Sequence, residues 1–388
     1  MILESMELVP AGQAVEYAWA RLSRYQNIAY TAKILSTLHQ LGPAHARNVR
    51  KQATQIRYCL LQAKEYFEAA RGVSAATRPL LLYYGIMSLA LAQVLMKGTG
   101  DSSLDRARGQ NAHHGLVLKH RENPSAQNDL TAAASALAAA PHVNGNGLRV
   151  GTFELWHALS REAPIVGSQK TYFSNGGVRS RLITIAVGRD EEMEALEVGG
   201  ISLLKCFQNT PGMSAILPTL GVEGELVKAH VTFEEHEATN ECVTALIIQP
   251  GDQALLDRVC SMCIFEPRLL HQLEIVEMPS GYIIRDRFVT GSDQCAASYP
   301  NAFQIDSKNV FLSAGIQSLN EFGVLYAGIY ILGNYARYYP EQWMKDVEES
   351  SDLSHAVEGF MSIVEERGPL LTLSELARIF FVPEHRSQ

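Results

Sequence analysis

The chain of 388 residues contains, at positions 77–96, the stretch TRPLLLYYGIMSLALAQVLM. After Arg78 this stretch has no charged side chain as far as Met96, so it is too long for an ordinary strand and apolar on every side. Pro79 suits the first turn of a helix because its missing N–H would have no partner there. We therefore expect a helix with little water around it at the centre of the fold.

This apolar stretch also has the length of a short membrane span, because about 18 uncharged residues is the lower limit for crossing a bilayer. Polar side chains interrupt it at Tyr83, Tyr84, Ser88 and Gln93, and no second apolar stretch of that length follows in the sequence. These features favour a buried core helix over a membrane span. We predict no membrane span.

Helical periodicity recurs on both sides of this segment. Apolar residues at intervals of three and four, with charged residues between them, predict amphipathic helices. These predicted helices cover about 14–40, 47–71, 322–339, 354–366 and 374–381. The helix at 322–339 is largely apolar, and Pro340 sets its limit. Short connections indicate an up-and-down bundle, and the simplest arrangement packs the helices of both ends together.

The middle of the chain has a different texture. Gly, Ser, Asn and His dominate between 99 and 150, apart from a short alanine-rich helix at 130–140. From 182 to 300, alternating or β-branched runs separated by turn residues predict mostly antiparallel strands, with one helix near 253–265. We therefore predict an α+β fold that is mainly α, with a helical bundle from the N- and C-terminal segments and a central β-rich unit. The predicted parts are an N-terminal helical part (1–98), a connector (99–150), a β-rich central unit (151–300) and a C-terminal helical part (301–388).

The composition is that of an ordinary globular protein, with 47% hydrophobic and 19% charged residues. A net charge of -8 gives no broad basic surface, so small molecules or proteins are favoured as partners over nucleic acid. The N-terminus has early acidic residues and lacks the basic and apolar regions of a secretory signal. The six cysteines have no framework spacing. Both features predict a cytoplasmic protein with reduced thiols.

Short motifs follow one another along the chain in an order that resembles a known family. The motifs are YFEAA at 66–70, RPLLLYYG at 78–85, HGL at 114–116, GTFEL at 151–155, ARYYPEQW at 336–343 and GPLL at 368–371. In combination and order they resemble the YaaC-like proteins of bacteria, whose biochemical role is not established. The resemblance covers most of the chain and implies a bacterial origin and a cytoplasmic location. It implies no catalytic residues.

The tyrosine-rich helices provide the first candidate ligand-binding residues. Tyr83, Tyr84 and Tyr338 offer aromatic area with polar tips, and Arg78 and Arg337 border the same two segments. If these helices pack together, their ends line a pocket in which Tyr and Arg groups face an anionic ligand. The alternative is a core in which each hydroxyl has an internal partner.

A second candidate is the sequence SNGGVRSR at 174–181, which joins a turn to Arg179 and Arg181. Backbone N–H groups and guanidinium groups in such a segment can hold an anion. A hairpin turn with solvated charges is the favoured alternative.

A third candidate is catalytic. Arg108 and His113 have four residues between them, with Asn111 inside, and match the Arg-x4-6-His signature of HEPN ribonucleases. In those enzymes the Arg is thought to stabilise phosphate charge while the His acts as acid or base on the 2′-hydroxyl. The pattern is loose, and Gly109 and Gly115 place it in a loop, so solvated side chains or structural hydrogen bonds are the favoured explanation.

Two further patterns contain residue types that bind metals, but the spacing of these residues does not fit a shared metal site. His230, Glu234 and His236 would point to one face of a strand, but at about 3.3 Å per residue the two histidines would lie ~20 Å apart. Cys260 and Cys263 form a Cys-x-x-Cys pair without a second pair of ligands. A polar strand face and buried helix thiols explain these residues, so we predict no metal. Motifs for nucleotide phosphates, zinc proteases and α/β-hydrolases are absent from the sequence, and we predict no cofactor.

We therefore predict a cytoplasmic bacterial protein of the YaaC-like type that acts through a protein partner or a small anionic ligand rather than by catalysis. The alternative is a metal-independent HEPN-like ribonuclease that uses Arg108, Asn111 and His113. Nucleic acid is a partner only in that alternative, and a homo-oligomer remains open in both.

Overall fold

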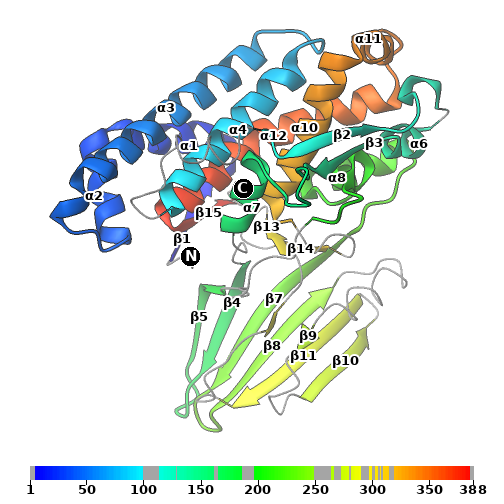
Figure 1. Cartoon of the computed structure of the whole chain (residues 1–388). Coiled ribbons are helices and arrows are strands. Elements are labelled where there is room, and N and C mark those ends of the chain that lie inside the picture. Colours follow the sequence, from blue (N-terminus) through cyan, green and yellow to red (C-terminus); the bar gives the residue numbers. More distant parts are fainter. Residues whose placement is uncertain are drawn as a thin grey trace.

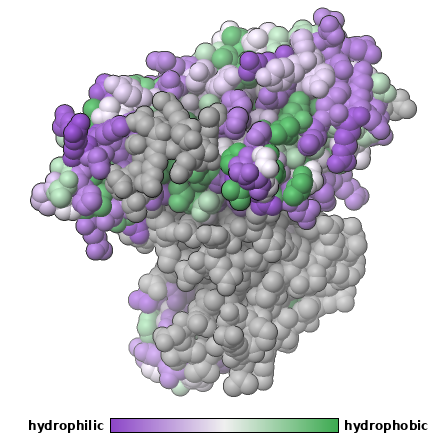
Figure 2. Space-filling model, in the orientation of Figure 1, coloured by the Kyte–Doolittle hydropathy of each residue, from purple (hydrophilic) through white to green (hydrophobic). Residues whose placement is uncertain are grey.

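The computed structural model shows a helical part and a large sheet beneath it (Figure 1). It describes residues 5–98, 113–127, 129–160, 165–185, 196–248, 264–265, 272–278, 281–289, 297–298, 302–304, 306, 309–313 and 319–384. The fold is mainly α with additional β structure, as the sequence predicts. On the face drawn in Figure 2, hydrophilic residues dominate the surface of the helical part, with hydrophobic residues in small patches between them.

The helices of the described residues are α1 (Ala14–Leu22), α2 (Ile28–Leu38), α3 (Ala46–Arg71), α4 (Arg78–Lys97), α6 (Leu130–Ser135), α7 (Thr152–Leu159), α8 (Leu203–Gln208), α10 (Glu321–Tyr338), α11 (Pro340–Glu348) and α12 (Asp352–Ala377). The strands are β1 (Ser5–Pro10), β2 (Leu116–His120), β3 (Leu137–Pro141), β4 (Ile165–Tyr172), β5 (Val178–Ile185), β6 (Ile201–Ser202), β7 (Leu226–His236), β8 (Glu241–Ile248), β9 (Ile264–Phe265), β10 (Gln272–Met278), β11 (Gly281–Val289), β12 (Ala297–Ser298), β13 (Ala302–Gln304), β14 (Val310–Ser313) and β15 (Ile379–Glu384).

The apolar stretch of the sequence forms α4, at the centre of the helical part. This helix packs against α3, α7, α10 and α12, so helices from both ends of the chain surround it. Gly85 lets α4 lie close to α3, because a Cβ at this position would lie 2.7 Å from the ring of Phe67 on α3. By length and composition α4 passes as a membrane span, but 72% of that stretch is buried inside the protein, as in a core helix.

The predicted helix at 14–40 is two helices, α1 and α2, separated by a 3-10 turn at Ser23–Gln26. Asn27 has extended backbone angles, and its side chain accepts a hydrogen bond from the N–H of Tyr30 at 3.1 Å. Asn27 therefore caps the start of α2. The spacing of apolar residues continues through the turn, so the sequence pattern does not show that the helix is interrupted there.

The last predicted pair of helices, at 354–366 and 374–381, is instead the single helix α12 followed by β15. Pro369 lies inside α12, and the residues from 367 to 374 are all buried. Packing therefore stabilises the helix in spite of the missing N–H of the proline. Arg378 ends it with a left-handed backbone (φ 58°), and β15 then pairs in parallel with β1.

The predicted alanine-rich helix at 130–140 is correct only in its first half. After α6 the chain turns into β3, whose five residues are all buried between β2 and β6. Alanine has a high helix propensity but a small side chain, so tertiary pairing overrides its preference at low cost. The predicted connector thus contains two strands of a three-stranded sheet.

The large sheet has the strand order β10-β11-β8-β7-β14-β13, and the hairpin β4–β5 joins it through β4. All described pairings in it are antiparallel except that of β4 with β7, in agreement with the mostly antiparallel prediction. Strands β13 and β14 follow residue 300, whereas α7 and α8 from the 151–300 span pack on α4 and α10. The predicted helix at 253–265 lies outside the described residues except for its last two, which form β9.

Candidate functional site

Helices α4 and α10 cross in the core and bring tyrosines from distant parts of the sequence together. Gly333 of α10 allows this approach, since a Cβ there would lie 3.0 Å from the Cβ of Tyr83. The ring of Tyr83 packs edge-on against Tyr330, with centroids 5.3 Å apart. Both rings are buried, with 2% and 4% of their surface exposed.

His114, which precedes β2, extends this aromatic pair towards the surface. Its Nδ1 lies 2.7 Å from the hydroxyl of Tyr83, while the hydroxyl of Tyr330 donates to the carbonyl of Leu116 at 2.7 Å. His114 lies at the surface of the protein. The hydroxyls thus tie the start of β2 to the crossing of the two helices.

Arg337, near the end of α10, is an exposed residue on the surface side of this group of aromatic rings. Its Nη1 donates to the hydroxyl of Tyr84 at 3.2 Å, and its guanidinium lies 5.0 Å from the ring centroid of Tyr338. Tyr84 in turn stacks on Tyr66. Among the described residues no carboxylate pairs with Arg337, so neutral groups orient its charge. We call Tyr83, Tyr84, His114, Tyr330, Arg337 and Tyr338 the Tyr83–Arg337 cluster.

At neutral pH the guanidinium of Arg337 is the charged group of this cluster. Partial burial, Arg337 and His113 all lower the pKa of His114, so its imidazole is neutral at pH 7. Burial raises the pKa of Tyr330 to about 12 and that of Tyr83 well above its usual range, so both phenols keep their protons. A His114 tautomer that accepts from Tyr83 at Nδ1 carries its own N–H at Nε2. The surface of the cluster therefore offers an N–H donor beside a guanidinium.

The structure places the predicted residue Arg78 in a different arrangement. Its Nη2 lies 2.7 Å from Oε1 of Glu365 on α12, and Arg71 approaches the other oxygen at 3.4 Å. This ion pair joins α4 to α12. The guanidinium of Arg78 therefore has a counter-ion, whereas that of Arg337 has none among the residues that the structure describes.

The predicted segment at 174–181 spans the turn of the β4–β5 hairpin and the start of β5, which carries Arg179 and Arg181. Ser174 donates from both its N–H (2.9 Å) and its hydroxyl (3.0 Å) to Glu237, and these bonds lower the pKa of that carboxyl. Arg179 is exposed and stacks on Phe173 at 5.6 Å, while the side chain of Arg181 lies outside the described part. A carboxylate of the chain thus already uses the donors that an anion would need.

The ribonuclease signature is described only at its last residue. Arg108 and Asn111 lie outside the described residues. His113 is exposed, and its ring stacks on that of His142 with centroids 4.6 Å apart. The HEPN-like hypothesis stays a prediction.

No group of three or more His, Cys, Asp or Glu residues in the described ranges could hold a metal ion. In β7 the ring of His236 stacks on Tyr172 of β4, with centroids 4.7 Å apart. Cys260 and Cys263 lie outside the part of the chain that the structure describes.

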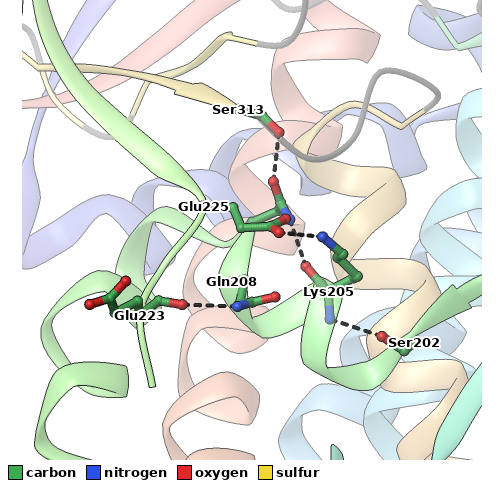
Figure 3. A network of polar contacts seen from close by, with 7 residues as sticks. Ser202, Lys205, Gln208, Glu223, Glu225 and Ser313 are labelled. Atoms are coloured by element: carbon green, nitrogen blue, oxygen red, sulfur yellow. Dashed lines mark hydrogen bonds and ion pairs between the residues drawn. The ribbon is translucent and has the colours of Figure 1, made fainter. Parts of the chain in front are cut away.

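A second polar network is centred on α8 (Figure 3). Glu225 forms an ion pair with Lys205 and accepts from Asn209 at 3.0 Å, and Asn209 accepts from the hydroxyl of Ser313 at 2.6 Å. Asn209 and Ser313 have no exposed surface, so their bond is a structural link between the end of α8 and β14, while the side chain of Lys205 is 40% exposed. Sequence patterns could not find it, because Asn209 and Ser313 are 104 positions apart.

Sequence reasoning also missed His114 as a site residue, and it considered Tyr330 only as one of several tyrosines on the apolar helices. His114 stands in the motif HGL, and Tyr330 has only the helical period of α10 as a signal. Neither pattern shows that the start of β2 meets the crossing of α4 and α10.

The fold and site define an α+β protein whose helical bundle displays an arginine–tyrosine–histidine cluster at the crossing of two core helices. The family model described as YaaC-like Protein matches residues 23–134 and 194–376, so the chain belongs to the YaaC-like family. These ranges include every member of the Tyr83–Arg337 cluster, while the motif at 151–155 lies between them. Comparison with curated proteins and with solved structures gives no match.

Proposed function

We propose that this protein binds a small anionic ligand at the Tyr83–Arg337 cluster and acts in the bacterial cytoplasm as a ligand-binding component rather than as an enzyme. The observation that carries the proposal is the exposed guanidinium of Arg337, which Tyr84 and Tyr338 orient and which no carboxylate of the described residues neutralises. An oriented guanidinium without a counter-ion has the properties of an anion receptor.

The neighbours of Arg337 support binding in two ways. Tyr84 and Tyr338 restrain the long side chain before the ligand arrives, which lowers the entropy lost on binding. His114 adds an N–H donor, and its neutral form does not compete with the guanidinium for counter-ions. Phosphate and carboxylate groups fit this donor set, because their oxygens can accept from the two nitrogens of one guanidinium.

The protonation states favour binding over proton transfer. Tyr83 and Tyr330 stay protonated because burial raises their pKa values, and Nδ1 of His114 is occupied by the Tyr83 hydroxyl. Within the cluster only Arg337 is charged at neutral pH. Such a site holds an anion without itself supplying a base.

Calorimetric titration with inorganic phosphate at pH 7.5 tests the proposal. We expect the Arg337→Gln variant to bind phosphate about ten- to a hundredfold more weakly, the loss typical of a charge-assisted hydrogen bond. The matched control is Arg57→Gln, which removes an exposed arginine of α3. Equal affinity in the wild type and in Arg337→Gln, or no binding of phosphate by the wild type, would contradict the proposal.

A further inference from the structure

A second candidate site lies at the other end of the helical bundle. A cavity of about 210 Å³ opens where α2 and the turn before it meet the end of α12 and the start of β15. It shares no residue with the Tyr83–Arg337 cluster. The lining residues come from segments that only tertiary packing brings together, so no local sequence motif predicts the cavity.

Three arginines, Arg21, Arg24 and Arg378, line this cavity. The guanidinium of Arg24 lies 5.1 Å from the ring centroid of Tyr30, and no carboxylate of the described residues pairs with it. Arg21 is held 5.3 Å from the ring of Phe381 and shares its charge with Glu7 at 3.4 Å. Arg24 therefore places at the cavity a positive charge that no carboxylate of the described residues neutralises.

The remaining wall is apolar. The cavity is also lined by Ile34 and Leu38 of α2 and by Leu373 and Leu376 of α12. Leucine and isoleucine side chains gain free energy when an apolar group replaces water between them. A fully hydrated inorganic ion would gain nothing from this wall.

Tyr25 lines the same cavity, and only 5% of the residue is exposed. Its hydroxyl is not one of the enclosed polar atoms that lack a partner in the described part of the chain, so burial alone does not demand a ligand there. A phenol hydroxyl can still donate to a carboxylate bound in the cavity. Arg21 and Arg24 lie close enough to act on the pKa of Tyr25, so its ring shares a site with both guanidiniums.

We infer that this cavity binds a small carboxylate with an apolar tail. The carboxylate accepts from Arg24 and from the hydroxyl of Tyr25, and the tail lies between Leu38 and Leu376. The volume equals that of about seven water molecules at ~30 Å³ each, which suits a ligand of about eight non-hydrogen atoms. A linear six-carbon carboxylate has this size. The inference goes beyond the anion binding proposed for Arg337, because it assigns a different ligand to a separate place.

Titration with sodium hexanoate, 1-hexanol and inorganic phosphate tests the assignment on the full chain. We expect hexanoate to bind at least tenfold more tightly than either of the other two at this site. Arg24→Gln removes the charge and Ile34→Trp fills the apolar wall, and each should weaken hexanoate at least tenfold. Tyr25→Phe should weaken it several-fold while leaving the ring in place.

Two controls separate this site from the first. Arg57→Gln and Arg337→Gln should bind hexanoate as the wild type does. The inference is overturned if hexanoate does not bind, if hexanol binds equally well, or if Arg24→Gln and Ile34→Trp both retain full affinity. Loss of hexanoate binding in Arg337→Gln would overturn it too, because the carboxylate would then occupy the Tyr83–Arg337 cluster.

Discussion

Two arginines of the helical part, Arg367 and Arg337, differ in their burial and in their partners. Arg367 is 5% exposed and donates to both oxygens of Glu321, at 2.6 and 2.7 Å, and to the carbonyl of Gln304 in β13 at 2.9 Å. Arg337 is exposed and contacts only neutral groups among the described residues. The first charge is used within the fold, where it joins α12 to α10 and to the sheet. The second is oriented but left available.

The difference is one of solvation. A buried guanidinium needs a counter-ion because the low dielectric of the interior makes an isolated charge very costly. A surface guanidinium keeps its hydration and needs none. An arginine that is oriented at the surface without a carboxylate therefore suggests an external partner, whereas a buried pair suggests a structural role.

Removing the counter-ion of Arg367 should have the largest effect. Glu321→Gln leaves a buried guanidinium without an opposite charge, and we expect the free energy of unfolding to fall by about 3–5 kcal/mol. Urea denaturation measures this. The matched control is Glu365→Gln, whose partners Arg71 and Arg78 are 48% and 20% exposed and keep part of their hydration, so we expect a smaller loss. Equal losses in the two variants would remove the contrast between the fully buried and the partly exposed ion pairs.

A smaller effect should follow from single hydroxyl groups of the aromatic core. Tyr83→Phe removes the bond to His114, so we expect a loss of about 1 kcal/mol in unfolding free energy and weaker phosphate binding. Tyr326→Phe is the control, because its buried hydroxyl has no partner in the described part of the chain. Deleting that hydroxyl should leave stability unchanged or raise it. A larger loss in Tyr326→Phe than in Tyr83→Phe would show that the pattern of hydrogen bonds is wrong.

The smallest expected effect concerns pH. The pKa of His114 is lowered in the folded protein, so the unfolded chain binds the proton more readily, and stability falls as pH decreases through 6.5 towards the folded pKa. An anion on Arg337 would favour protonated His114. We therefore expect sulfate, whose charge is constant in this range, to bind several-fold more tightly at pH 5 than at pH 7.5. His114→Gln should lose most of this pH dependence, and an unchanged profile would exclude His114 from the site.

Sequence patterns predicted the regular parts of the fold well. The apolar stretch of α4, the amphipathic period of α3 and the limit at Pro340 each depend on local chemistry, and the structure confirms them. The errors lie where tertiary contacts outweigh local preference. Buried packing keeps α12 continuous through Pro369, and strand pairing converts the end of the alanine-rich segment into β3.

The candidate site shows the same division. Tyr83, Tyr84, Arg337 and Tyr338 could be selected as residue types on two helices that were expected to pack, and the structure brings them into one cluster. Arg78 looked equivalent to Arg337 in the sequence. Only the position of Glu365, 287 residues away, makes it a structural ion pair.

The sequence by itself determined the class of this protein: a helical bundle around a helix with no charged side chain between its two ends, with a mostly antiparallel sheet and the motifs of the YaaC-like family. Local periodicity and propensity are enough for this, because the spacing of apolar residues along a segment reflects the face that its helix or strand must bury. The tertiary structure alone decided which charges are neutralised within the fold. That outcome depends on long-range pairing and on burial, since a guanidinium at the surface can remain hydrated and one in the core cannot.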